Sequence, residues 1–463
     1  MVGEASLPGS VESLVKRLLA LTKRGPTSDR ARLAVRGGAW SIAGYVTTQL
    51  LRTVVTMVLA RVFLGPETFG VVGLVGVFLA GLAMFSELGI LANVVQHPRG
   101  DDPLFLNTAF SVQATRGLVI WVIAAMAAYP MAVFYQQPQL LALLLVAGCS
   151  ETIRGLTSTA AWTLTRHVNL RGITLLTIAS EVVAAAVAIL WAVASPSAWA
   201  LVARTIASAA VYALGTHFIA MPRVKFGWDK AAAKDILHFG GWISLATAAY
   251  FLSGQGERLI LGKFITAAEL GCFSLAVMIS SMPAGGISQL VNQIFLPIIS
   301  RSVRDGSESA VHDFSRARKL FFACSIFASF GFLLCSKPFV ALLLPPKYAM
   351  TGWMLQALGL RVGMDIFAAP ASTVILAYGQ SKYSAAASTL RLVVMIAGIG
   401  VSFKLFGIHQ AVLSLVIAQG VSYFPMMLGL GRLLPAVARQ ELRWYMLFLG
   451  LTVLGGFLSW RVL

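Results

Sequence analysis

The sequence has few charged residues for its length. Only 12% of its 463 residues are Asp, Glu, Lys or Arg, whereas 58% are hydrophobic; soluble domains carry about 25% charged residues. No polar segment of domain size interrupts the chain, which excludes an ordinary soluble protein. After Gly37 the sequence consists of apolar runs separated by short polar breaks, and each run has about the 20 residues that a helix needs to cross a bilayer.

The alternation of apolar and polar residues that marks a membrane β-barrel is also missing. Lipid offers no hydrogen-bond partner to backbone groups, so apolar runs of this length must form helices. We therefore expect an all-α integral membrane protein with about thirteen transmembrane helices. The expected spans are 38–63, 69–95, 105–130, 139–164, 172–194, 197–220, 237–262, 269–299, 319–343, 352–378, 384–404, 409–432 and 442–462.

Motifs of catalysis and nucleotide binding are absent. The Gly262-Lys263 pair lacks the upstream glycine spacing of a P-loop, and the sequence contains no HExxH or Gly-x-Ser-x-Gly motif. The six histidines show no metal-ligand spacing. The four cysteines lie singly in apolar runs, where they are best interpreted as small hydrophobic residues. The sequence thus predicts no cofactor and no metal.

The charge that is present is mostly basic, with a net value of +18. If the N-terminus is cytoplasmic, 23 of the 36 lysines and arginines fall on the cytoplasmic side, 6 on the opposite side and 7 within spans. Positive residues gather on the cytoplasmic side of membrane proteins. Topology therefore accounts for most of the net charge, and we expect no nucleic-acid partner.

Residues 1–36 form a basic tail before the first span. Within it, Val11, Leu14, Val15 and Leu18 share one helical face. This pattern is typical of a helix lying on an anionic inner leaflet, but a basic tail that serves only to set topology would fit equally well. The first apolar run begins late and no small-residue cleavage site precedes it, so we expect no removable signal peptide.

Two stretches, 201 to 203 positions apart, resemble each other. The first span opens with GGAWSI at 37–42 and the seventh with GGWISL at 240–245; farther on, LAR at 59–61 and FG at 69–70 are matched by LGK at 261–263 and LG at 270–271. Six spans precede the connection at 221–236, so both halves begin on the same side and the repeat is parallel. We expect an N-lobe (37–220), a linker (221–236), a C-lobe (237–433), a central cavity between the lobes, and an extra helix over 441–463.

Ionisable residues inside the apolar runs are the candidate functional residues, because charge is costly in lipid. Glu151 and Arg154 are three residues apart and Arg361 and Asp365 four apart, so each pair shares a helix face and is predicted to form an ion pair. Four arginines have no acid within four residues of them: Arg52, Arg116, Arg204 and Arg391.

For these four arginines two interpretations stay open. Acids on other helices, such as Glu87 or Glu181, would pair with them, or they bind an anionic substrate. A guanidinium fork fits a pair of phosphate oxygens, so Arg52, Arg116, Arg204 and Arg391 are candidates for binding a diphosphate, with Arg52 and Arg116 near mid-membrane. The candidates for ion coupling or structural ion pairs are Glu181, Glu257, Asp365, Arg361, Glu151 and Arg154.

Short motifs resemble those of a known family. The stretch 59–70 reads LARxxLGPxxFG and is followed by FxxLG at 85–89 and VxQ at 94–96; LLLPPKY at 342–348 and AxGQ at 377–380 agree. These motifs are similar to those of the polysaccharide-transporter (WzxC-like) branch of the multidrug/oligosaccharidyl-lipid/polysaccharide (MOP) exporter superfamily. The resemblance covers roughly residues 37–430.

The resemblance implies two six-helix lobes around a central cavity, in the bacterial inner membrane. It implies a flippase that moves an undecaprenyl-diphosphate-linked oligosaccharide from the cytoplasmic to the periplasmic leaflet by alternating access, for exopolysaccharide, capsule or O-antigen assembly. The implied partners are this lipid-linked glycan, membrane lipids and the glycan polymerase machinery. Two alternatives remain: a cation-coupled multidrug exporter, which should have unpaired acids in its cavity, and a membrane glycan polymerase or ligase, which needs a sizeable outer loop.

Overall fold

The structure, a computed structural model, describes residues 29–462, and the regular elements in this range are all helices. The predicted surface helix of the tail lies outside the described residues. The first half contains α2 (Asp29–Val58), η1 (Leu59–Phe63), α3 (Pro66–Phe85), α4 (Ile90–Gln96), α5 (Pro103–Phe134), α6 (Gln139–Gly155), α7 (Ala161–Arg166), α8 (Arg171–Ala194) and α9 (Trp199–Ile219). The second half contains α10 (Lys230–Phe264), α11 (Ala267–Leu290), η2 (Val291–Phe295), α12 (Leu296–Asp305), α13 (Ser307–Leu343), η3 (Pro346–Tyr348), α14 (Met350–Ala377), α15 (Ser381–Phe406), α16 (Ile408–Leu433) and α17 (Pro435–Val462).

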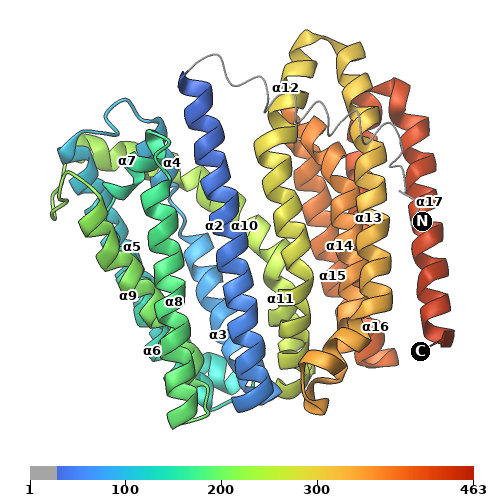
Figure 1. Cartoon of the computed structure of the whole chain (residues 1–463), viewed down its shortest axis with the longest axis horizontal. Coiled ribbons are helices and arrows are strands. Elements are labelled where there is room, and N and C mark those ends of the chain that lie inside the picture. Colours follow the sequence, from blue (N-terminus) through green and yellow to red (C-terminus); the bar gives the residue numbers. More distant parts are fainter. Residues whose placement is uncertain (1–28, 463) are drawn as a thin grey trace, which may run out of the picture.

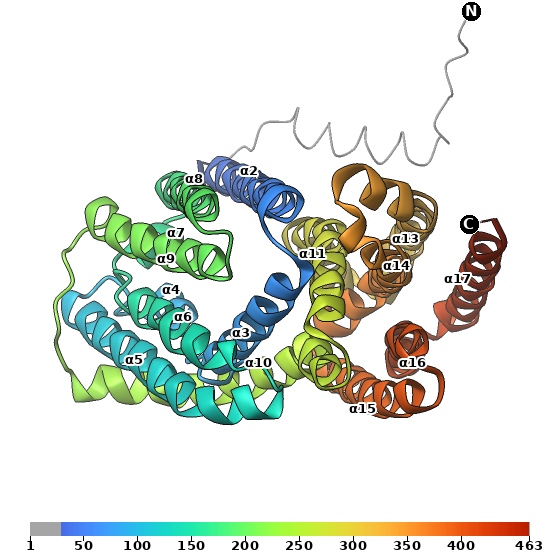
Figure 2. The same cartoon turned by 90° about the horizontal axis from the view of Figure 1, so that it is seen from below.

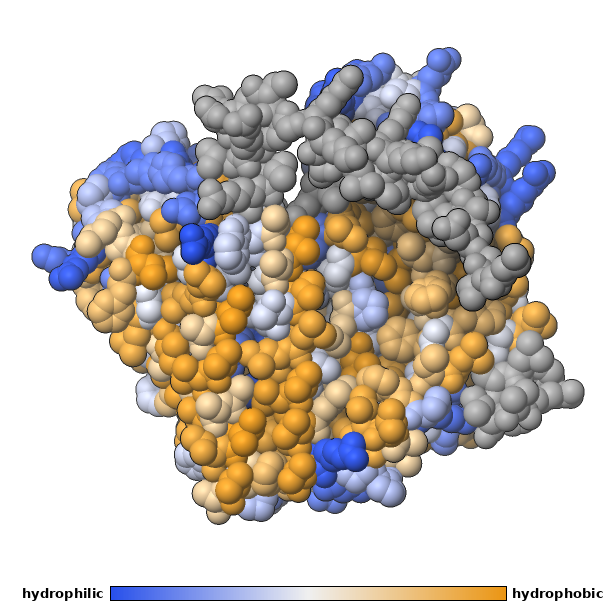
Figure 3. All heavy atoms as spheres, viewed as in Figure 1, coloured by the Kyte–Doolittle hydropathy of each residue, from blue (hydrophilic) through white to orange (hydrophobic). Residues whose placement is uncertain are grey.

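Ten of the described helical segments are long and apolar enough to cross a membrane. The chain is therefore a multi-pass helical membrane protein, and Figure 3 shows the apolar belt between its two polar ends. The count of thirteen stays a prediction, because the spans expected from α6, α10 and α17 are not among the ten. The α6 helix has only 17 residues.

Two of the predicted spans are broken near the predicted cytoplasmic side. The expected span 69–95 ends as a helix at Phe85, and α4 begins only after Gly89, whose φ of 56° is left-handed. The Glu87 carboxylate accepts a hydrogen bond from the Gly89 N–H at 3.0 Å and stabilises this turn. The expected span 139–164 is likewise divided into α6 and α7 by a Ser/Thr-rich segment, in which the Thr159 hydroxyl donates to a backbone carbonyl of α5.

The long helices form two groups, which Figures 1 and 2 show side by side. The N-terminal group comprises α2 to α9, and the C-terminal group comprises α11 to α16, with α17 packed on its outside against α13 and α16. The α10 helix packs against α3 of one group and α15 of the other. The predicted lobe boundaries therefore stay a prediction, since α10 belongs to neither group by packing alone.

The predicted linker 221–236 is fixed to the N-terminal group. Backbone N–H groups of Lys225, Gly227 and Asp229 donate to side-chain oxygens of α5 at 2.8–3.0 Å, and Arg99 reaches the Asp229 carboxylate at 3.0 Å. Ala232 and Ile236 complete a small apolar core with residues of α4 and α5. Thus α10 starts from a fixed point on the N-terminal group before it crosses towards the C-terminal group.

The two groups meet where α3 crosses α11. A methyl group added at Gly70 would overlap the carbonyl oxygen of Ala267, and one added at Gly271 would overlap the carbonyl oxygen of Pro66. These glycines are the matched positions of the sequence repeat, so the repeat coincides with the close contact between the groups. Only residues without a Cβ permit two helices to approach so closely.

Backbone carbonyls and long side chains tie the groups together at the predicted periplasmic end. Arg61, at the end of η1, donates to the carbonyl of Leu342 at 3.0 Å, and its repeat equivalent Lys263 donates to the carbonyl of Phe134 at 2.8 Å. Lys347 adds a hydrogen bond of 2.7 Å to the carbonyl of Leu64. At the opposite end α2 and α11 diverge (Figure 1).

Candidate anion-binding site

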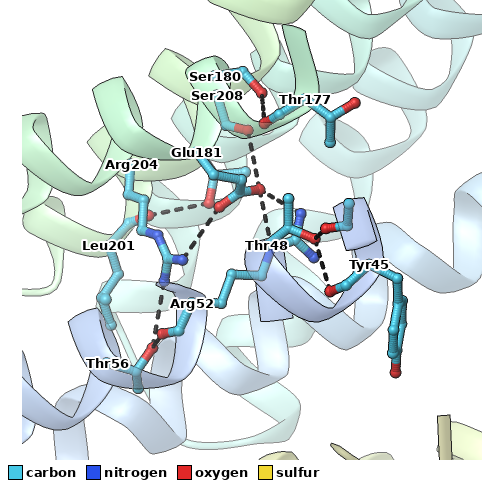
Figure 4. A network of polar contacts seen from close by, with 12 residues as sticks. Tyr45, Thr48, Arg52, Thr56, Thr177, Ser180, Glu181, Leu201, Arg204 and Ser208 are labelled. Carbon is cyan, nitrogen blue, oxygen red and sulfur yellow. Dashed lines mark hydrogen bonds and ion pairs between the residues drawn. The ribbon is translucent and has the colours of Figure 1, made fainter. Parts of the chain in front are cut away.

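Arg52, Glu181 and Arg204 form one ion-paired cluster on α2, α8 and α9 (Figure 4). Arg52 donates through Nε at 2.9 Å and also through Nη2 to Oε1 of Glu181. Arg204 reaches Oε2 at 3.4 Å, and its other terminal nitrogen lies 3.3 Å from the Thr56 hydroxyl. The Ser208 hydroxyl is 3.5 Å from Oε1.

Small residues make this convergence possible. The α2 helix lies so close to α8 that a Cβ at Gly44 would meet the methyl group of Thr174. On α8 the buried face is built from alanines at 184, 185, 188 and 192. Side chains this short allow the neighbouring helices to approach, so the long arginine side chains can meet the carboxylate between them.

Exposure separates the three charged groups. The side chain of Glu181 is 5% exposed, that of Arg204 16%, and that of Arg52 52%. A buried carboxylate is costly unless it is paired, and Glu181 is paired twice. Because two guanidinium groups share one carboxylate, the cluster has a formal charge of +1, and Arg52 presents that charge on an accessible surface.

Arg116 has a different environment. Its Nη2 contacts the Glu87 carboxylate at 3.0 Å and the carbonyl of Ala83, and its Nε lies 3.2 Å from the Ser86 hydroxyl. All three partners belong to the end of α3 and the turn that follows it. Arg116 is 18% exposed, so its guanidinium is used mainly to hold this helix end.

The predicted Arg361–Asp365 ion pair is corrected by the structure. Arg361 pairs instead with Glu257 of α10, a neighbouring helix, and both side chains are nearly inaccessible. Asp365 is attracted by Arg391 of α15 as well as by Arg361. The spacing of four residues places Arg361 and Asp365 on the same face of α14. It does not show that Glu257, from another helix, comes closer to the Arg361 guanidinium than Asp365 does.

The predicted pair of Glu151 and Arg154 is confirmed, with 3.7 Å between the charged atoms. Arg154 is 54% exposed and lies in the last turn of α6. This pair is a structural one at a helix end, because neither residue contacts the Arg52 cluster in the described contacts.

A further buried cluster was missed by the sequence analysis. Arg318 and Glu441 form an ion pair in which both side chains are 1% exposed. The Arg318 guanidinium lies 4.3 Å above the Phe367 ring and 3.2 Å from the Tyr423 hydroxyl, which itself donates to Glu441. Arg318 and Glu441 each come one residue before an expected span, since those spans begin at 319 and 442. Their similar expected depth was the one feature of the sequence that could have predicted their contact. The cluster attaches α17 to α13, α14 and α16.

Solved structures of membrane transporters share this fold. The structure superposes on the lipid II flippase MurJ in an inward closed conformation with a TM-score of 0.67, covering 92% of this chain and 98% of that one at 11% identity. It superposes on an inward-facing MATE multidrug transporter of the MOP superfamily with a TM-score of 0.68, covering 85% and 96% at 14% identity. At such identities the likeness establishes the fold alone, which is that of MOP transporters.

The sequence narrows the class to a family. Residues 58–351 match the family described as polysaccharide biosynthesis protein, and the chain belongs to that family. It is 24% identical over 282 residues to the succinoglycan biosynthesis transport protein ExoT of Rhizobium meliloti (strain 1021), covering 59% of this chain and 55% of that protein. It is 23% identical over 156 residues to the teichuronic acid biosynthesis protein TuaB of Bacillus subtilis (strain 168), covering 34% and 32%. The chain thus matches about half of the first relative's length and a third of the second's. The chain is therefore a member of the polysaccharide biosynthesis protein family that has the fold of known membrane transporters.

Proposed function

We propose that the protein flips a diphosphate-linked saccharide on a polyprenyl lipid from the cytoplasmic to the periplasmic leaflet of the bacterial inner membrane. The observation that carries the proposal is the half-exposed Arg52, which shares Glu181 with Arg204 at membrane depth in a polysaccharide transport fold. A cation held at this depth needs a functional reason. A bidentate guanidinium suits the oxygens of a phosphate.

Among the predicted arginines, the geometry favours Arg52 and Arg204 as the pair that receives the diphosphate. Arg116 has its hydrogen bonds directed to the end of α3. Arg391 attracts Asp365 electrostatically in the second half of the molecule. Glu257, Arg361 and Asp365 would then be the charged set involved in ion coupling, or in holding α10 to α14.

Alternating access is supported by the unequal ends of the molecule. The predicted periplasmic end is closed by Arg61, Lys263 and Lys347, each bonded to a carbonyl of the opposite half. The structure also superposes better on the inward-facing MATE transporter, at a TM-score of 0.68, than on an outward-facing one, at 0.55. We therefore assign this conformation to the state that receives substrate from the cytoplasmic side.

The lipid part of the substrate needs an apolar surface. A groove of about 550 Å³ runs between α14, α16 and α17 and is lined by Leu360, Met364, Val416, Phe424, Tyr445 and Leu449 among others. We propose that α17 shapes a surface for a polyprenyl chain, in addition to serving as a strut. The Arg318–Glu441 ion pair, which holds α17 against α13, is compatible with both roles.

Transport by purified protein in liposomes tests the proposed function. The substrate is a fluorescent saccharide on undecaprenyl diphosphate, and its arrival in the opposite leaflet is read by an impermeant quencher. Replacing Arg52 with Ala should reduce the rate at least about tenfold, since a charge-assisted bidentate contact contributes more than about 1.4 kcal/mol. Arg52→Lys should give an intermediate rate, because lysine retains the charge without the fork.

The matched control is Arg154→Ala, which removes an arginine of similar exposure, 54% against 52%, from a helix end. Its transport rate should equal that of the unaltered protein. Equal rates in Arg52→Ala and Arg154→Ala would overturn the assignment of Arg52. Efflux of cationic drugs without movement of the glycolipid would instead establish the multidrug alternative.

A further inference from the structure

The Arg52–Glu181–Arg204 cluster already contains an anion of the protein itself. Glu181 accepts hydrogen bonds from both guanidinium groups through different carboxylate oxygens, so it takes the bidentate role that a phosphate would take. Resting on the proposed function, we propose that Glu181 is a resident anion that the substrate's diphosphate displaces and that later returns to expel it. Glu181 would thereby set how tightly the site holds its substrate.

Charge makes the exchange possible in both directions. One carboxylate neutralises one of the two arginines, and the cluster keeps a formal charge of +1. A diphosphate diester carries a negative charge on each phosphate, so it replaces the charge of Glu181 and neutralises the remaining one. The displaced Glu181 carboxylate stays close to the bound diphosphate and repels it, because both are negative. This repulsion favours the return of Glu181 to the arginines once the site faces the opposite leaflet.

The two arginines have unequal freedom. Arg204 is 16% exposed and is held by the Thr56 hydroxyl at 3.3 Å as well as by Glu181. The hydrogen bonds described for the Arg52 side chain are to Glu181, and that side chain is 52% exposed. Arg204 is therefore the fixed half of the site, and Arg52 is the half that turns from Glu181 to an entering anion.

A transporter must not bind its substrate too tightly, and the competition from Glu181 weakens that binding. Binding must be favourable enough for substrate to enter and weak enough for it to leave. Two guanidinium groups at membrane depth without a competing anion would bind a diphosphate strongly and release it slowly. Glu181 competes for the same donors, so removing its charge should tighten binding and slow turnover together.

The test uses Glu181→Gln in the full-length protein, because the amide keeps the shape of the side chain and loses its charge. The probe is a saccharide on a short-chain polyprenyl diphosphate, which is a diphosphate diester, with affinity measured by titration in detergent and transport measured in liposomes. We expect affinity to rise about tenfold, equivalent to about 1.4 kcal/mol, while the transport rate falls. Glu181→Asp, which shortens the carboxylate and weakens both ion pairs, should give a smaller rise in affinity.

The control is Glu151→Gln, which alters another largely buried glutamate, 13% exposed, that pairs with Arg154 at the end of α6. Its affinity for the probe should not rise.

Unchanged or weaker binding in both Glu181 variants would overturn the inference, and if Glu181→Gln does not fold, the affinity of Glu181→Asp alone tests it. Loss of probe binding in Arg52→Ala together with no gain in the Glu181 variants would reject this inference and leave the proposed function in place. Absence of binding in every variant and in the unaltered protein would reject the proposed function itself.

Discussion

Gly70 and Gly271, which occupy matched positions of the internal repeat, lie against each other where α3 crosses α11. Each stands next to a backbone carbonyl of the opposite helix, at Ala267 and Pro66 respectively. A backbone carbonyl cannot move aside as a flexible side chain does. The contact between the two halves at this crossing is therefore made by main chain, which fixes how closely α3 and α11 approach.

This crossing predicts a sharp position dependence for alanine substitutions on α3. Gly70→Ala should destabilise the protein by about 1–3 kcal/mol, the usual cost of overpacking a tight contact, and should lower transport. Gly76→Ala on the same helix is the matched control, because a Cβ there meets nothing within 4 Å. Thermal unfolding in detergent measures both. Equal melting temperatures for the two variants would contradict the close crossing.

The ties at the predicted periplasmic end should control how often that end opens. Replacing Arg61 and Lys263 together with Met removes two hydrogen bonds to carbonyls of the opposite half. In a protein lacking its native cysteines, a cysteine placed at Leu64, which is 1% exposed, should then react faster with an impermeant thiol reagent.

Lys404→Met provides the control for charge on the same predicted side, since Lys404 is exposed at the end of α15. Its labelling rate should match that of the protein with both cations intact. If the double variant also labels at that rate, the two side chains do not hold the end closed.

The Arg318–Glu441 pair predicts that one change is worse than two. Glu441→Gln should cost about 3–5 kcal/mol of unfolding free energy, because it leaves a buried guanidinium without its counter-charge. Arg318→Met combined with Glu441→Leu should recover most of that loss, since well-packed apolar residues often replace a buried pair without net cost. The melting temperatures of the single and the double variant test this prediction. A double variant that melts at a lower temperature than the single one would show that the charges themselves stabilise the packing of α17.

Acid should loosen the connection between α5 and the segment that leads into α10. Arg99 lowers the pKa of Asp102 below 3.8, mainly through its hydrogen bond, and the backbone N–H of Ala231 and then Arg99 lower the pKa of Asp229 below the same value. A carboxyl with a lowered folded-state pKa contributes stability above its unfolded pKa and loses it as the pH falls through the folded value. Asp102→Asn should therefore reduce the melting temperature at pH 7 and make it depend less on pH below about 4. Parallel melting curves for variant and unaltered protein across this range would contradict the linkage.

The sequence by itself determined the membrane class, the positions of most helices, the polysaccharide transporter resemblance and the Glu151–Arg154 pair. These features depend on the composition of single segments and on the spacing of residues within one helix. Whether a run is apolar enough for lipid depends on its own composition, and residues three apart on a helix face the same way in any fold. The repeat was visible for the same reason, since Gly70 and Gly271 occupy matched positions in two similar stretches.

Only the tertiary structure decided which charges on different helices meet. Arg361 pairs with Glu257 on another helix and not with Asp365 on its own. Arg318 and Glu441 meet although their spacing of 123 positions does not predict a contact, and only their similar expected depth pointed to it. Arg52 and Arg204 likewise pair with an acid on a neighbouring helix, whereas Arg116 pairs with Glu87 in the turn after α3. Ion pairing falls off over a few ångströms, and distances between helices are set by small residues such as Gly44 that let two particular helices approach. Partner choice is thus a property of the packed helices and not of any one of them.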